Sequence, residues 1–286
     1  WLVDEVAAQV PADELAAAVA GLTAPAPLWI RVNRRRATPA VVIAALTAEG
    51  ATVAPTDLDD HALAVRGLGD PARSPSFRAG QWTVQDLAAQ LVARLVDPQP
   101  GERLLDACAG VGGKTTHLAE LAGDARIDAV DPIATKLELG RAAAARLGLA
   151  GITGHVGALA SLPADRTYDR VLVDAPCSGA GVLRRHPEAA TRLTRDDVRG
   201  LAALQRELLD LAATRVRPGG VLVYAVCTIT EAEGPAQIAA FCARHPAFTL
   251  VTPALPPAVC VGAHVRTWPH RHDADGFFAA RLMRGA

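Results

Sequence analysis

The sequence lacks the features of membrane and secreted proteins. It contains no run of about 18 uncharged apolar residues, which a membrane-spanning helix requires. Its opening, WLVDEVAAQVPADEL, carries acids early and has no basic start, unlike a signal peptide. Because the chain begins with Trp1 rather than Met, we expect further sequence upstream. We therefore expect a cytoplasmic protein without a membrane partner.

The sequence also lacks the spacings that bind metal ions. Its cysteines are odd in number and irregularly placed, with no CxxC pair, and its histidines show no metal-ligand spacing. We therefore expect no metal, and reduced thiols in the cytosol. The cysteines are Cys108, Cys177, Cys227, Cys242 and Cys260.

Neither sign of charge is in excess, because the net charge is −1. The overall balance therefore does not indicate nucleic-acid binding, but arginine is concentrated in two regions. The first region contains no acid and the second is diluted by acids, so a solvated surface and a nucleic-acid contact both remain open. The regions hold Arg31, Arg34, Arg35 and Arg36, and Arg184, Arg185, Arg192, Arg195 and Arg199.

Half of the 286 residues are hydrophobic, which is enough for one large or two modest domains. The first part mixes short elements: LWIRVN (28–33) predicts a strand, and 38–50 predicts a helix capped by Thr38 and stopped by Gly50. The turn-rich segment 67–80 is a candidate linker. We predict an N-terminal α+β domain over 1–80 and a catalytic domain over 81–286.

After this segment, strands and helices alternate. Such alternation predicts an α/β fold with a parallel sheet covered on both faces. In that fold, ligands bind at the carboxyl ends of the strands. The predicted helices are 83–96, 114–123, 134–148 and 201–216, and the predicted strands are 103–108, 127–131, 168–176, 221–227 and 276–283.

Two of the strand ends indicate a nucleoside-containing cofactor. The glycine loop that follows the first strand lets backbone approach a ligand, and the next helix N-terminus favours an anionic group. Its spacing is neither a P-loop nor GxGxxG, so a plain tight turn remains an alternative. Asp131 ends the next strand, where an acid can accept both ribose hydroxyls or cap the following helix. The loop consists of Cys108, Ala109, Gly110, Val111, Gly112, Gly113 and Lys114.

Two further strand ends carry thiols. DAPCSGAGVLRRHPE places Asp174 and Cys177 after one strand, and VLVYAVCTIT places Cys227 after the next. A thiolate beside a cation or helix N-terminus is a good nucleophile, although a buried structural role suits Cys177 taken alone.

These segments resemble the Sun/nucleolar-protein family of RNA cytosine-5 methyltransferases, most closely the bacterial ribosomal RNA small-subunit methyltransferase B type. The resemblance covers nearly the whole chain: WIRVN, WTVQD, the glycine loop, VDAPCSGAGVLRRHPE, VYAVCTI and DGFFAARL. It implies a Rossmann-like methyltransferase sheet with a small N-terminal domain similar to an RNA-recognition fold. It also implies S-adenosyl-L-methionine as cofactor and RNA, expected to be ribosomal, as partner. We expect a monomer.

The resemblance also implies roles for the site residues. Cys227 would attack carbon 6 of cytosine, which lets carbon 5 accept the methyl group. Cys177 would assist release of the RNA. Asp174 would hydrogen-bond the base edge and would also contact the cofactor. The loop from Cys108 to Lys114 and Asp131 would hold the cofactor.

The chain departs from the family pattern at several positions. Gly110-Val111 replace the usual Ala-Pro, and an acid expected near Gly157-Ala158 to bind the adenine amine is absent. Three further departures are Val226 for Thr, Thr228 for Ser and Ala190 for Lys. Alternatives are a transfer RNA cytosine-5 methyltransferase, a DNA cytosine methyltransferase using the Pro-Cys cysteine as nucleophile, and a non-catalytic RNA-binding ribosome assembly factor.

Overall fold

The computed structural model describes residues 1–286, which form two compact units. We call Pro27–Ala158 the glycine-loop unit. We call Trp1–Ala26 together with Leu159–Ala286 the cysteine unit. Residues 1–26 therefore pack with the C-terminal half of the chain rather than with residues 27–80. The domain boundary between residues 80 and 81 stays a prediction.

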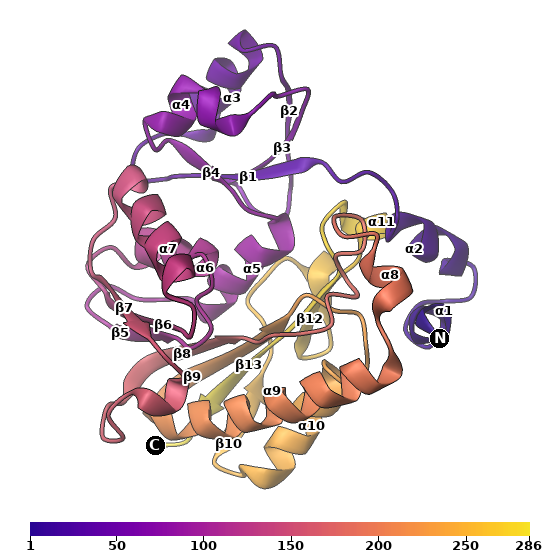
Figure 1. Ribbon diagram of the computed structural model, residues 1–286, viewed down its shortest axis with the longest axis vertical. Helices are drawn as coiled ribbons and strands as arrows, with labels where there is room; N and C mark the ends of the chain where they lie inside the picture. The colour runs from indigo at the N-terminus through magenta and orange to yellow at the C-terminus, as the bar shows by residue number, and fades with distance from the viewer. The chain divides into compact units, whose positions relative to one another are not determined.

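The glycine-loop unit begins with a small antiparallel sheet in the order β2-β3-β1-β4 (Figure 1). Its core contains Ile30, Leu46, Leu63 and Trp82. Thr38 caps α3 by accepting a hydrogen bond from the Val41 amide, as the sequence predicts. The elements are β1 (Leu28–Val32), α3 (Pro39–Ala48), β2 (Thr52–Pro55), β3 (Ala62–Arg66), α4 (Pro75–Arg78) and β4 (Trp82–Val84).

The segment 67–80 is a folded part of this small domain. It forms a 3-10 helix, Pro71–Arg73, and the short helix α4, whose Phe77 packs against the core. The Trp82 indole Nε1 donates to the Ser76 hydroxyl at 2.8 Å, which fixes the segment to β4. The predicted helix start at residue 83 is wrong, because residues 82–84 pair with β1 and Asp86 caps a helix that begins at Leu87.

The second part of the glycine-loop unit alternates strands and helices. β5 (Arg103–Asp106), β6 (Arg126–Asp131) and β7 (Ile152–Val156) pair in parallel in that order. The helices are α5 (Leu87–Val96), α6 (Gly113–Ala122) and α7 (Ala134–Leu147). The sequence did not predict β7, because ITGHV contains a glycine and its side chains are exposed or half-buried.

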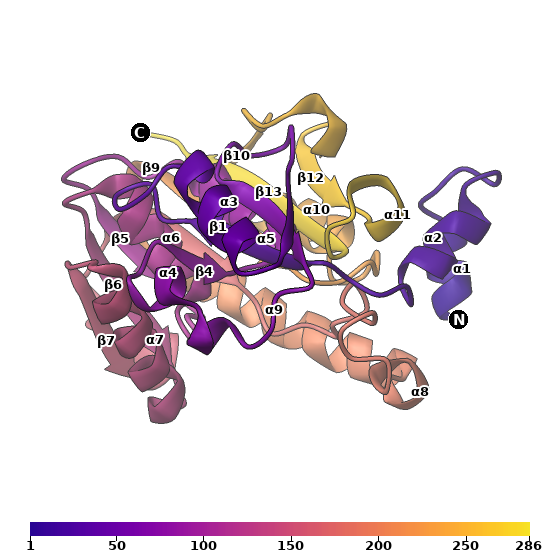
Figure 2. The same ribbon diagram turned by 90° about the horizontal axis from the view of Figure 1, so that it is seen from above.

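The cysteine unit contains a mixed sheet. β8 (Tyr168–Asp174) runs parallel to β9 (Val216–Val226), and β13 (Phe277–Arg284) pairs antiparallel with β9. The antiparallel strands β12 (His264–Thr267), β11 (Cys260–Val261) and β10 (Phe248–Val251) extend this sheet and were not predicted. Helix α9 (Arg195–Arg215) runs along β8 and β9 and packs on α10 (Pro235–Arg244) (Figure 2).

Helix α9 begins before the predicted residue 201. Thr194 and Asp197 form a reciprocal capping box, which satisfies backbone donors at the N-terminus of α9. Near the start of the chain, α1 (Leu2–Ala7) and α2 (Leu15–Gly21) bury Val6, Ala18 and Leu22 against Ile229 and Trp268. The short helices α8 (Ala189–Arg192) and α11 (Pro269–His272) complete the unit.

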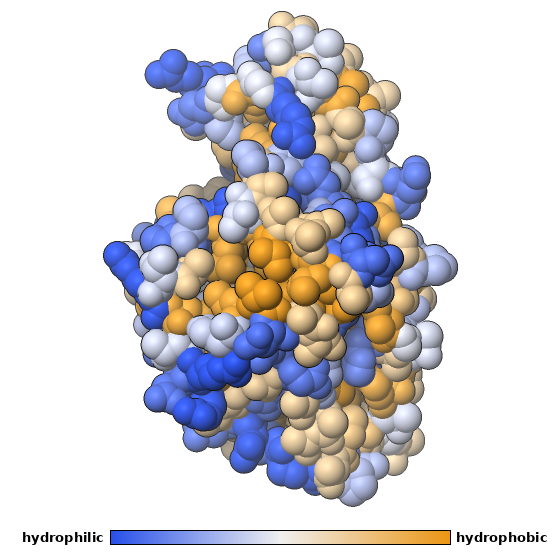
Figure 3. Space-filling view, turned by 90° about the vertical axis from the view of Figure 1, so that its right-hand side faces the viewer, coloured by the Kyte–Doolittle hydropathy of each residue, from blue (hydrophilic) through white to orange (hydrophobic).

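None of the helices is long and apolar enough to cross a lipid bilayer. On the face shown in Figure 3, both polar and apolar side chains reach the surface, and the apolar ones gather in patches.

Candidate active site

The glycine loop connects β5 to α6 through two residues with positive φ. Gly110 has φ +55° and Gly112 has φ +81°, values that favour glycine. A Cβ at residue 112 would lie 2.8 Å from the Gly140 Cα of α7, so this position excludes side chains. The Ala109 amide donates to the Val130 carbonyl at 2.9 Å, which holds the loop beside the end of β6. The loop therefore presents bare backbone at the carboxyl ends of parallel strands.

Asp131 organises this loop. Its side chain accepts from the Gly110 amide at 3.0 Å through Oδ2 and from the Ile133 amide at 2.8 Å through Oδ1. One carboxylate thus fixes both the glycine loop and the turn into α7. Asp131 is only 6% exposed, yet each oxygen has a second lone pair. Asp131 therefore binds a backbone amide at the start of α7 and can still accept hydrogen bonds from a ligand.

Apolar side chains surround these strand ends. Val111 in the loop, Ile133 after β6 and Val156 at the end of β7 are 54%, 46% and 61% exposed. Such side chains offer an apolar face to a purine ring, and the bare loop backbone offers donors. The residues present therefore fit a nucleoside-containing cofactor, although no acid occupies 157–158.

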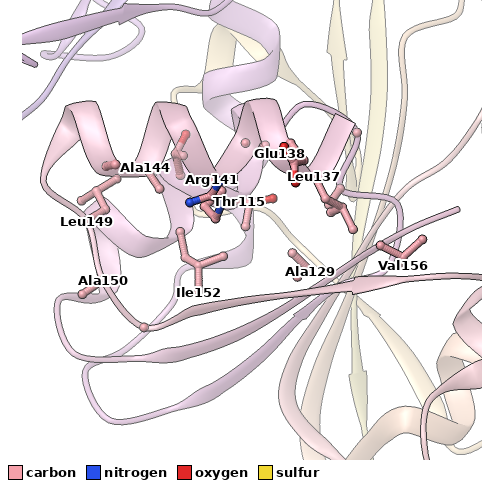
Figure 4. Close-up of a pocket in the computed structure, with 18 of the residues that line it drawn as sticks. Thr115, Ala129, Leu137, Glu138, Arg141, Ala144, Leu149, Ala150, Ile152 and Val156 are labelled. Atoms are coloured by element: carbon pink, nitrogen blue, oxygen red, sulfur yellow. The ribbon is translucent and has the colours of Figure 1, made fainter. Parts of the chain in front are cut away.

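A cavity of about 390 Å³ adjoins the loop and extends beneath α7 (Figure 4). Ala109, Gly110 and Gly112 line it on the loop side. Small side chains on α7 and on the facing strands keep it open, among them Ala144, Ala129 and Gly154. Of the predicted cofactor residues, Cys108, Lys114 and Asp131 do not line the cavity. Most of the cavity lies between α7 and the strands β6 and β7.

The two predicted catalytic cysteines lie together. Cys227 directly follows β9, and Cys177 follows β8, whose Asp174 is in register with Ala225. Because β8 and β9 are parallel, both thiols lie at the same edge of the sheet. Their sulfur atoms are 3.2 Å apart, and both residues are partly buried. The sequence prediction that two neighbouring strand ends bring these thiols together is therefore confirmed.

The contact between the sulfurs and their burial affect the ionisation of Cys177. The hydrogen bond to Cys227 raises the pKa of the Cys177 thiol well above its ordinary value, and burial raises that pKa further. The thiolate form of Cys177 is therefore disfavoured while the two sulfurs are in contact.

A buried carboxylate next to the cysteines was not predicted. Glu233 is fully buried and accepts hydrogen bonds from Ser178 and Thr228, the residues that directly follow Cys177 and Cys227. The adjacency of a hydroxyl residue to each cysteine was the signal available in the sequence. No local pattern in the sequence marks Glu233, which lies five residues after Thr228, as a neighbour of the cysteines. Only the turn before α10 places its carboxylate next to Thr228.

The structure shows that several arginines of the two arginine-rich regions are buried or paired with acids. Arg31 is 1% exposed and pairs with Glu120, and the side chain of Arg184 is buried against Asp273 and Asp275. Arg195 and Arg199 also have acidic partners. Arg34, Arg35 and Arg36 are exposed and form one turn available to a polyanion, and Arg192 of the second region is exposed as well.

No group of three or more His, Cys, Asp or Glu side chains is placed to hold a metal ion.

Comparison with known proteins identifies the family of the chain. A family model described as 16S rRNA methyltransferase RsmB/F matches residues 93–283, and a model for the ferredoxin-like domain of RsmF/B-like methyltransferases matches residues 1–70. Ribosomal RNA small subunit methyltransferase B of Vibrio cholerae is 38% identical over 263 residues, covering 91% of this chain and 59% of that protein.

Two solved structures are similar over nearly the whole chain. The crystal structure of PH0851 has a TM-score of 0.93 at 33% identity, covering 99% of this chain and 65% of that one. NSun6 from Pyrococcus horikoshii has a TM-score of 0.88 at 20% identity, covering 100% of this chain and 98% of that one.

The fold is that of an S-adenosylmethionine-dependent methyltransferase. The chain belongs to the 16S rRNA methyltransferase RsmB/F family. It spans 59% of the length of the Vibrio cholerae relative. The predicted α/β class, family and cofactor are therefore confirmed.

Proposed function

We propose that this chain methylates carbon 5 of a cytosine in small-subunit ribosomal RNA through a covalent bond between Cys227 and the base. The observation that carries this proposal is the 3.2 Å contact between the sulfurs of Cys177 and Cys227 at the ends of two parallel strands. S-adenosylmethionine, held by the glycine loop and Asp131, would supply the methyl group.

The attack by Cys227 solves a problem of reactivity. Carbon 5 of cytosine is a poor nucleophile, but a bond from the Cys227 sulfur to carbon 6 converts the ring into an enamine that is nucleophilic at carbon 5. Asp174 ends β8, three residues before Cys177, and we assign it a hydrogen bond to the base edge. That contact would stabilise the charge that develops on the ring during attack.

Release of the product requires two bonds to break. After methylation, carbon 5 gives up its original proton to a water molecule acting as base, and the electron pair of that C–H bond expels the Cys227 sulfur from carbon 6 as a thiolate. Cys177 lies in hydrogen-bond contact with that sulfur, so we assign it to this release step. In the alternative arrangement of DNA cytosine methyltransferases the Pro-Cys cysteine, here Cys177, would attack, and replacing each cysteine separately distinguishes the two arrangements.

One observation supports a different function, a non-catalytic RNA-binding assembly factor. The absence of an acid at Gly157-Ala158 removes the expected partner of the adenine amine. Calorimetry with S-adenosylmethionine separates the two functions, because an assembly factor that has lost its cofactor site would give no binding heat. A transfer RNA substrate is separated by mapping 5-methylcytosine in total RNA with and without the gene.

Replacing Asp131 with Ala is expected to weaken S-adenosylmethionine binding by about 1–3 kcal/mol, the usual range for a lost hydrogen bond to a charged group. The substitution also removes the contacts to Gly110 and Ile133 that order the loop. Calorimetric titration measures the effect. Asp128→Ala is the matched control, because Asp128 lies on the same strand and pairs with His155. Equal affinity of the Asp131 variant and the wild type would remove Asp131 from the site.

Binding to RNA is expected to weaken steeply with salt through the exposed turn of Arg34, Arg35 and Arg36. Each phosphate contact to single-stranded RNA contributes about 0.7 to the slope of log affinity against log salt. Replacing all three arginines with Ala should therefore reduce that slope by about 2. Arg244→Ala is the control, because Arg244 pairs with Asp210. The same slope in the triple variant and the wild type would show that the turn does not meet the RNA backbone.

A further inference from the structure

Glu233 is a buried carboxylate satisfied entirely by neutral donors. Its Oε1 accepts from the Ser178 amide at 2.8 Å and from Gln205 Nε2 at 2.9 Å. Its Oε2 accepts from the hydroxyls of Ser178, Thr228 and Thr230 at 2.5, 3.1 and 2.8 Å. A buried charge is costly unless its lone pairs are filled, and here five donors fill them without a cation.

These donors lie next to the two cysteines. Ser178 follows Cys177, Thr228 follows Cys227, and their hydroxyl oxygens are 2.9 Å apart. Gln205 of α9 donates to the Pro176 carbonyl at 2.9 Å as well as to Glu233, so the network holds the chain on both sides of Cys177. One carboxylate thus joins the two strand-end loops at the residues adjacent to the two sulfurs.

Glu233 is itself fixed in place. The Tyr224 hydroxyl donates to the Glu233 carbonyl at 2.7 Å, and Tyr224 is a fully buried residue of β9. The carboxylate is therefore anchored to the strand that carries Cys227. From there it reaches across to the loop that carries Cys177, which is the arrangement required to hold two sulfurs at a fixed separation.

We infer that Glu233 is a positioning residue of the methyl-transfer site, which maintains the contact between Cys177 and Cys227 through Ser178 and Thr228. This inference rests on the proposed function, in which Cys177 assists the departure of Cys227. Loss of the carboxylate lets the two loops separate. Attack by Cys227 then continues, whereas release slows because Cys177 no longer touches the departing sulfur.

The inference is tested by asking whether Glu233→Gln, which retains both cysteines, accumulates a covalent protein–RNA adduct. Glu233→Gln keeps the size of the side chain but replaces one acceptor oxygen with a donor group facing donors. Turnover is expected to fall by about 10- to 100-fold, as for a displacement near 1 Å at a reacting group. A protein–RNA band should accumulate on a denaturing gel, and it should disappear when Cys227→Ala is added. S-adenosylmethionine affinity should stay within about twofold of the wild type, because the cofactor residues lie elsewhere in the chain.

A second pair of variants keeps the inference testable if Glu233→Gln does not fold. Thr228→Val removes the hydroxyl at nearly constant volume, and Thr228→Ser retains it. The Val variant should accumulate the adduct and the Ser variant should not. Glu207→Gln, at an exposed position on α9, is the control for loss of one carboxylate and should resemble the wild type.

The outcomes separate this inference from the proposed function. If Cys177→Ala traps an adduct while Glu233→Gln and Thr228→Val turn over like the wild type, the positioning role is overturned and the proposed function stands. If neither Cys177→Ala nor Glu233→Gln traps an adduct and both remain active, the covalent mechanism fails and the inference fails with it. Slow turnover of Glu233→Gln without an adduct also overturns the role in release.

Discussion

We expect Cys227→Ala to abolish methyl transfer, and we expect Cys177→Ala to accumulate a covalent protein–RNA adduct. The attacking sulfur is absent in the first variant, so no bond to carbon 6 can form. In the second variant attack and methylation proceed, but the sulfur 3.2 Å from Cys227 that assists its departure is missing. Methyl incorporation and a denaturing gel measure the two results.

The controls for this experiment separate chemistry from binding. Both variants should bind S-adenosylmethionine and RNA like the wild type, because neither thiol belongs to the glycine loop or the arginine turn. Cys242→Ala is the matched control, since Cys242 lies on α10. An adduct trapped in Cys227→Ala and absent from Cys177→Ala would reverse the two roles. Full activity in both variants, with no adduct, would eliminate the covalent mechanism.

Replacing Arg31 with Ala is expected to lower the free energy of unfolding by about 3–5 kcal/mol, the cost of breaking a buried ion pair from one side. The side chains of Arg31 and Glu120 are both fully buried, with Nε and Oε2 3.1 Å apart. Burial lowers the pKa of Arg31 and raises that of Glu120, and their mutual attraction opposes both shifts. Without Arg31, Glu120 remains buried beside Thr116 without its charged partner. Urea denaturation measures the loss as a lower midpoint at constant slope.

Two further variants show whether the loss comes from the ion pair. Arg34→Ala, three residues along the chain and exposed, should change the stability by at most about 0.5 kcal/mol. The double variant Arg31→Met with Glu120→Leu should recover much of the stability, because apolar side chains of similar volume often replace buried ion pairs without loss. A loss below about 1 kcal/mol in Arg31→Ala would mean that the pair behaves like a surface salt bridge.

The same arginine links the small antiparallel sheet to the glycine loop. Arg31 of β1 donates to the Gly113 carbonyl at 3.2 Å, and Gln85 donates to the same carbonyl at 3.3 Å. Gly113 belongs to the predicted glycine loop and is the first residue of α6. We therefore expect Arg31→Ala to weaken S-adenosylmethionine binding as well as stability, which calorimetry on the folded variant would show.

Local sequence signals predicted many helices and strands, both in the small antiparallel sheet region and in the alternating region that follows it. Thr38 and Gly50 bound α3 because capping and positive φ depend on residue type alone. The strands ending at Asp131, Asp174 and Val226 were predicted from short apolar runs, and the placement of Cys177 and Cys227 followed from the rule that parallel strands end at one edge. The strands β10, β11 and β12 were missed because short antiparallel strands are stabilised by their neighbours rather than by their own composition.

The sequence by itself determined the order of strands and helices, the glycine loop and the meeting of the two thiols, because each depends on periodicity or on residues at fixed positions beside a strand end. Only the tertiary structure decided which charges are buried. Arg31 and Arg34 belong to the same basic run, yet Arg31 is buried because Glu120, Gln85 and Thr116 come to it from distant segments. Glu233 became part of the cysteine site for the same reason, since the donors that stabilise a buried carboxylate are assembled only by the fold.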